Sequence, residues 1–212
     1  MQRMSKAFYL GSFIGATIVM IMIIVFGIIA IAIAAPNVAD FKTPAIIGLV
    51  FLIMLLIAIV LYIVVVTVMM HYKMWNAIND EEMPIHPVLA VALLIIPIVS
   101  FFWLFAVYPL YVKFYNEYIE RQAVGVEAIK PGLFYAYPAL LGIYLVFTIF
   151  AQIGLFLNGG TPVVIFFMML NLIGSVASLT SFVVFLFLIS KICDAVNVLP
   201  LPTMERVINS AR

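Results

Sequence analysis

The chain has 212 residues, of which 67% are apolar and 9% are charged, whereas a soluble domain is roughly half apolar and about a quarter charged. This composition excludes a water-soluble globule, because about four to six membrane spans of roughly 20 residues would use nearly the whole length. The net charge of +1 excludes a strongly basic surface, so we expect no nucleic-acid partner.

The first predicted transmembrane helix covers residues 8–35. Arg3 and Lys6 precede it, which is the order found in a signal peptide, but no charge interrupts residues 7–35. Since the apolar core of a signal peptide is only about 7–15 residues long, we expect a retained helix. Gly11 and Gly15 form a small-xxx-small pair on this helix, a pattern typical of close helix packing.

The second predicted helix covers residues 44–79. It begins at Pro44, a residue type favoured in the first helical turn, and stays apolar through Met70. Helical composition then continues past the expected bilayer through His71 and Trp75 to an acidic turn at residues 80–82.

Two interpretations remain for residues 88–121, because Pro97 and Ser100 interrupt the apolar run. Residues 88–96 and 101–121 either form a re-entrant helical hairpin or belong to one helix kinked at Pro97. The first interpretation gives four transmembrane helices plus a Pro-broken re-entrant hairpin, and the second gives five transmembrane helices. Helices over 132–157 and 162–192 complete the chain, and the short link at 158–161 requires an antiparallel hairpin.

The positions of the ten Lys and Arg residues favour the re-entrant hairpin. With five spans, Arg3, Lys6 and Lys73 oppose the other seven; with the hairpin, nine share one side and Lys42 alone lies opposite. Because cytoplasmic loops carry an excess of Lys and Arg, we predict a single all-α membrane domain in a bacterial inner membrane. Both termini are then cytoplasmic, and residues 193–212 form a short cytoplasmic tail.

A segment within residues 70–121 carries a resemblance. An aromatic and basic stretch from Tyr72 to Ile78 precedes Pro87 and then a core from Pro97 to Trp103 that is similar to Pro-hydrophobic-x-Asn/Ser-x-Trp, with two residues instead of one between Ser100 and Trp103. This order resembles a family of small bacterial polytopic membrane proteins of unknown function. The chain departs from the family pattern at Ser100, where Asn is common, and in its acidic turn. The resemblance implies a membrane-embedded architecture and no catalytic activity.

Aromatic side chains line one face of the helix that follows this core. Four tyrosines recur at spacings of three, four and three, and two tryptophans join them to complete the stripe Trp75, Trp103, Tyr108, Tyr111, Tyr115 and Tyr118. Such a stripe is typical of an aromatic belt at a membrane interface. The alternative is a surface that stacks on a quinone, lipid or pigment.

Small and polar side chains align on the last two predicted helices. The spacing of three, four and three places Asn171, Gly174, Ser178 and Ser181 on one face, and Gln152 is the strongest polar candidate on the preceding helix. Such side chains suit close helix contact and interhelical hydrogen bonds. The alternative is a pathway for a solute.

The sequence contains no recognisable catalytic, metal-binding or phosphate-binding motif. It has no Ser-His-Asp set, paired carboxylates, metal motif or phosphate loop. His71 and His86 lack close ligand spacing for a metal or haem, and Cys193, the single cysteine, cannot form an internal disulfide. We therefore predict that the protein is not an enzyme and has no catalytic, cofactor-binding or metal-binding residues.

The leading hypothesis is a non-catalytic accessory or scaffolding subunit that packs against other membrane proteins or against itself. One alternative is a small channel or transporter for a neutral or lipophilic solute, which requires a polar cavity bounded by Gln152, Asn171 and Ser178. Proton coupling is disfavoured, because no Asp, Glu, Lys or Arg lies at mid-depth in the four full spans. A second alternative is a cofactor- or lipid-binding membrane protein.

Overall fold

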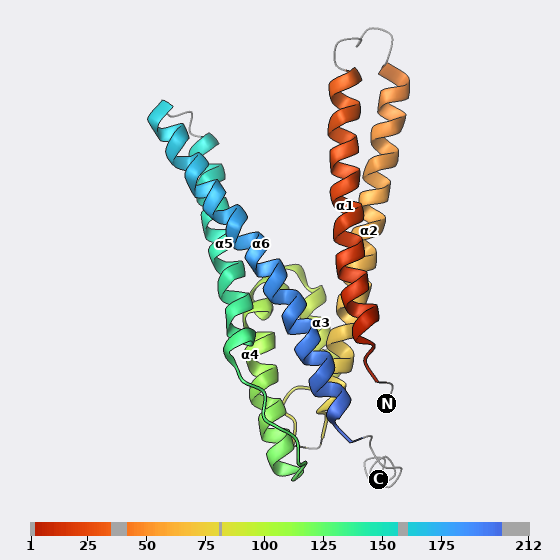
Figure 1. Cartoon of the computed structure of the whole chain (residues 1–212), viewed down its shortest axis with the longest axis vertical. Coiled ribbons are helices and arrows are strands. Elements are labelled where there is room, and N and C mark those ends of the chain that lie inside the picture. The colour runs from red at the N-terminus through yellow and green to blue at the C-terminus, as the bar shows by residue number, and fades with distance from the viewer. Residues whose placement is uncertain (1–2, 35–41, 81, 157–160, 201–212) are drawn as a thin grey trace. The chain divides into compact units, whose positions relative to one another are not determined.

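The computed structural model describes residues 3–34, 42–80, 82–156 and 161–200, and all regular structure in these ranges is α-helical (Figure 1). The helices are α1 (Lys6–Ala34), α2 (Lys42–Ala77), α3 (Pro87–Ile95), α4 (Pro97–Arg121), α5 (Gly132–Phe156) and α6 (Thr161–Val198). All except α3 are long and apolar enough to cross a membrane. The predicted all-α membrane architecture is therefore confirmed.

The helix bounds differ from the predicted ones mainly at the end of α6. This helix continues to Val198, so the first part of the predicted tail at 193–212 is helical, and residues 201–212 lie outside the described ranges. The predicted link at 158–161 also lies largely outside them. Within the described residues the chain forms two compact units, residues 5–70 and residues 1–4 with 71–212.

Helices α3 and α4 form a hairpin that turns at Ile96. A residue before proline is restricted to extended conformations, and Ile96 has φ −76° and ψ 112°. The indole Nε1 of Trp103 donates to the carbonyl oxygen of Ala90 at 2.9 Å. In one continuous helix these residues would lie about 20 Å apart, so α3 and α4 fold back on each other at Ile96, and α4 alone is long and apolar enough to cross a membrane.

The hairpin arms differ in length from the prediction. Pro97 and Ser100 lie in the first turn of α4 rather than in the break, because proline suits the first helical position, where its missing N–H leaves no bond unmade. The arms therefore have 9 and 25 residues. Proline sets the start of α3 in the same way, where Pro87 follows His86 in an extended conformation.

The two ends of the hairpin lie together. Arg121, the last residue of α4, forms ion pairs with Asp80 at 2.9 Å and Glu82 at 3.3 Å, just before α3. These ion pairs hold the end of α4 beside the segment that leads into α3.

Helix α4 ends in a Schellman motif. The N–H of Val124 donates to the carbonyl of Ile119, and the N–H of Ala123 donates to that of Glu120. This places Ala123 at φ 48°, in the left-handed region where glycine is usual. The strained turn directs the chain into the linker that leads to α5.

Helices α5 and α6 form the predicted antiparallel hairpin. Gly154 faces the ring of Phe167, whereas Gly174, further along α6, faces Thr148, which is earlier in α5. A Cβ built on Gly174 would lie 2.9 Å from the Thr148 hydroxyl oxygen. The two backbones therefore approach closely because glycine occupies these positions.

Candidate functional site

Rings of α2, α4 and α5 form a largely buried aromatic base, in which Trp103 and Tyr137 are half-buried. The base comprises Trp75, Trp103, Tyr108, Tyr111, Phe114, Tyr115, Phe134 and Tyr137. The ring centroid of Trp75 lies 6.0 Å from that of Tyr111 and 6.4 Å from that of Trp103. Phe134 of α5 stacks on Tyr111 at 6.3 Å. These spacings are those of favourable aromatic pairs.

The predicted tyrosine stripe lies inside the protein rather than on its surface. Tyr108, Tyr111, Tyr115 and Tyr118 are all buried, and the hydroxyl of Tyr115 donates to the carbonyl of Ala195 on α6 at 3.2 Å. Helix α6 has 38 residues and is about 57 Å long, so it exceeds a hydrocarbon core of about 30 Å. Its excess length covers the stripe.

Two polar atoms in the base have no hydrogen-bond partner among the described residues. They are the indole Nε1 of Trp75 and the hydroxyl of Tyr111, and both side chains are 0% exposed. A buried donor without a partner costs about 1–3 kcal/mol. His71 is also buried in this region, with its ring 5.4 Å from that of Tyr108.

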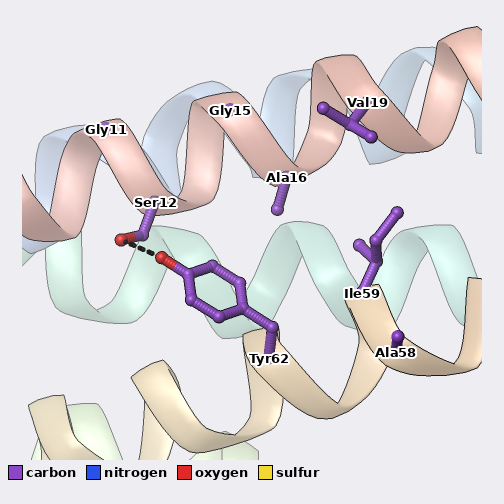
Figure 2. A pocket seen from close by; sticks show the side chains of 8 residues that line it. All are labelled: Gly11, Ser12, Gly15, Ala16, Val19, Ala58, Ile59 and Tyr62. Atoms are coloured by element: carbon purple, nitrogen blue, oxygen red, sulfur yellow. Dashed lines mark hydrogen bonds between the residues drawn. The ribbon is translucent and has the colours of Figure 1, made fainter. Parts of the chain in front are cut away.

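A groove of about 410 Å³ lies between α1 and α2 (Figure 2). Small side chains open it, and a hydrogen bond of 2.8 Å from the hydroxyl of Tyr62 to that of Ser12 crosses it. Gly11 and Gly15 lie along the groove, and a Cβ built on either would meet no atom within 4 Å. This small-residue pair therefore remains open instead of packing against α2.

The polar face predicted on α6 divides between the helix interface and the outside. Gly174 and Ser181 are buried, and Gly174 packs on α5. Asn171 and Ser178 are half-buried. The side-chain amide of Asn171 has no hydrogen-bond partner among the described residues, whereas the nearby hydroxyl of Ser175 donates to the carbonyl of Asn171 at 2.9 Å.

The structure does not join the residues expected to line a solute pathway. Gln152, which the sequence made a candidate for burial, is exposed on α5. No hydrogen bond links its amide to Asn171 or Ser178 in the part of the chain that the structure describes. The groove between α1 and α2 is elsewhere and is lined by none of these three residues.

The two histidines have separate surroundings. His86 lies outside the base and caps α3, where its Nδ1 accepts from the N–H of Val88 at 3.3 Å.

Cys193 is buried on α6. Across the described ranges, no three His, Cys, Asp or Glu side chains gather into a group that could hold a metal ion.

Two asparagines that sequence reasoning missed hold distant segments against the helices. The amide of Asn197 bonds both the N–H and the carbonyl of Met4 at 2.8 Å, and Asn116 bonds both backbone groups of Ile129 at 2.8 and 3.1 Å. The first pair joins residues 193 positions apart. No sequence pattern identifies such partners, because an amide can bind any accessible backbone.

Comparison of the chain with protein-family models, with curated proteins and with solved structures finds no match. The resemblance of residues 70–121 to small bacterial membrane proteins therefore stays a prediction.

Proposed function

We propose that this protein is a non-catalytic subunit of a larger membrane assembly and that its helices bind partner helices laterally in the bilayer. The unpartnered amide of Asn171 carries the proposal. Asn171 lies ten residues after Thr161, the first residue of α6, or about 15 Å along the helix. That distance is half of a hydrocarbon core of about 30 Å.

An amide at this depth favours contact with another helix. Lipid tails offer no hydrogen bonds, so polar groups in the hydrocarbon region are satisfied by protein or enclosed water. Side-chain amides bond across helices in membrane proteins. The exposed residues beside Asn171, including Leu172 and Val176, supply the apolar contact around such a bond.

The open groove on α1 supports a second lateral contact. Gly11 and Gly15 leave backbone accessible to a neighbouring helix, which is how small-xxx-small pairs permit close approach. Partner contact here is independent of Asn171, since the groove is formed entirely by α1 and α2.

The proposed topology places four helices across a bacterial inner membrane, with α3 and α4 as the re-entrant hairpin and both termini in the cytoplasm. Two observations support it. Nine of the ten Lys and Arg residues then share the cytoplasmic side, and the bonds between Asn197 and Met4 hold the start of the chain beside the end of α6.

The test is purification from native membranes in nanodiscs, followed by mass spectrometry of proteins that co-purify in constant ratio. Wild-type protein should retain a partner or further copies of itself, and Asn171→Leu should retain less. Asn171→Gln keeps an amide and should restore part of the association. Ser175→Ala is the matched control, because this exposed hydroxyl is already bonded to the helix backbone.

Recovery of the wild type as a lone chain surrounded only by lipid would contradict the proposal. Equal retention of partners by wild type and Asn171→Leu would show that Asn171 is not the contact. Thermal unfolding of each variant in the same detergent separates loss of a partner from loss of the fold.

A further inference from the structure

Satisfied and unsatisfied donors stand side by side in the aromatic base. The indole of Trp103 bonds Ala90 and the hydroxyl of Tyr115 bonds Ala195. The same groups on Trp75 and Tyr111 have no partner among the described residues, although both side chains are fully buried. The fold thus gives hydrogen-bond partners to the indole of Trp103 and the phenol of Tyr115, but not to those of Trp75 and Tyr111.

The two available donors belong to rings that touch. Trp75 comes from α2 and Tyr111 from α4, and their rings meet edge to face with centroids 6.0 Å apart. An indole N–H only donates, and a phenol hydroxyl donates readily, so the missing group is an acceptor. Buried polar groups are normally hydrogen-bonded, so each of these two donors lacks an acceptor.

The surroundings restrict the kind of molecule that carries the acceptor. Trp103 stacks beside Trp75 with an interplanar angle of 26°, and Phe134 stacks beside Tyr111 at 27°. Phe114 approaches Trp75 from a third direction, with centroids 6.1 Å apart. Flat apolar walls with a few fixed donors are typical of sites for small aromatic ligands.

We propose that Trp75 and Tyr111 are the donor end of a binding site for one flat, lipid-soluble molecule with a carbonyl oxygen, the chemistry of a quinone. The ligand's carbonyl accepts from the indole and the phenol, and its ring lies between aromatic side chains. The site requires no partner subunit and is independent of the function proposed above.

Access to the site runs through Trp103. The donors are closed from outside, so a ring must move before a ligand can enter. The indole of Trp103 stacks on Trp75 and, among the described residues, donates one hydrogen bond, to Ala90 of α3. When that bond breaks, the indole can rotate away from Trp75. Ligand binding therefore competes with the hydrogen bond between Trp103 and Ala90.

The experiment measures binding of a decyl-substituted benzoquinone to the purified chain by calorimetry, with decylbenzene as the compound that lacks a carbonyl. The variants keep a ring at each position. Trp75→Phe and Tyr111→Phe should each weaken binding about tenfold through loss of one hydrogen bond. Tyr135→Phe, at an exposed ring of α5, should leave binding unchanged, and Trp103→Phe should strengthen it, because phenylalanine makes no hydrogen bond to Ala90.

A second readout separates a ligand site from a packing defect. Without ligand, Tyr111→Phe should melt at a higher temperature than wild type, because the change removes a buried hydroxyl that has no partner. With the quinone present, wild type should gain more thermal stability than Tyr111→Phe. Three results would overturn the proposal: no binding of the quinone to wild type, binding by Trp75→Phe and Tyr111→Phe that is as tight as that of wild type, or binding of decylbenzene as tight as that of the quinone.

Discussion

The aromatic base and the α5–α6 hairpin obey different rules, although they belong to one unit. In the base, side chains from several helices bury one another and bond across the chain. In the hairpin, close contact comes from glycines, and many large apolar side chains are exposed, as Phe166 and Leu172 are. Because lipid is as apolar as these side chains, the hairpin needs no further cover for solubility in the membrane. The comparison indicates that the base determines the fold of the unit, while the hairpins offer surfaces for other helices.

The largest expected effect comes from removing the central ring of the base. Trp75→Ala should lower the free energy of unfolding by about 3–5 kcal/mol, because a buried aromatic ring leaves a cavity. Phe102→Ala is the control, since Phe102 is 67% exposed and should cost about 0.5 kcal/mol or less. Unfolding by SDS titration in mixed micelles measures both. Similar losses would remove the distinction between the base and the outer surfaces.

The next largest effect is expected in the hairpin. Gly174→Leu should cost about 1–3 kcal/mol, since even a Cβ meets the Thr148 hydroxyl oxygen at 2.9 Å. Gly15→Leu gives the same gain in helix propensity at a position with open space and should leave the isolated chain at least as stable as wild type. The same titration compares them. Equal stability of the two variants would show that glycine does not set the α5–α6 contact.

A smaller effect of opposite sign is expected at the edge of the base. Ala123 adopts φ 48° at the end of α4, where a side chain is disfavoured by about 1 kcal/mol. Ala123→Gly should therefore raise the free energy of unfolding by up to that amount, whereas Ala128→Gly in the same linker should not. A lower free energy of unfolding for Ala123→Gly would show that the left-handed conformation of Ala123 does not reduce the stability of the protein.

The smallest effect is expected from the ion pairs that join the ends of the α3–α4 hairpin. Glu82→Gln should cost about 1 kcal/mol or less, because the carboxylate of Glu82 is 74% exposed and water screens its attraction to Arg121. Raising the salt concentration should reduce the difference between wild type and variant. A cost that matches Trp75→Ala would show that charge, rather than aromatic packing, holds this region together.

Sequence reasoning located the helices because apolar length and proline act locally. The residues before Pro87 and Pro97 are extended because the proline ring clashes with a helical conformation of the preceding residue, and the position of a proline can be read directly from the sequence. The surroundings of the tyrosine stripe could not be predicted in this way. A spacing of three and four defines a face, but whether lipid or α6 covers that face depends on residues about 80 positions later, such as Ala195.

The candidate site showed the same division. Gly11, Gly15 and Asn171 were identified from residue type and spacing, but their openness was not, since it depends on what the remaining helices leave uncovered. Gln152 illustrates the converse, because a polar residue within an apolar run suggested burial and the structure exposes it. The bonds of Asn116 and Asn197 need three-dimensional positions before they can be recognised.

Photo-crosslinking in native membranes tests the central claim most directly. A photoreactive amino acid placed at Leu172, which is 65% exposed beside Asn171 on α6, is compared with one at Ile192, which is buried near the end of the same helix. We expect Leu172 to crosslink to one partner protein or a second copy, and Ile192 to crosslink only within the chain. Lipid adducts alone from Leu172, in membranes that hold the protein at its native level, would contradict the account.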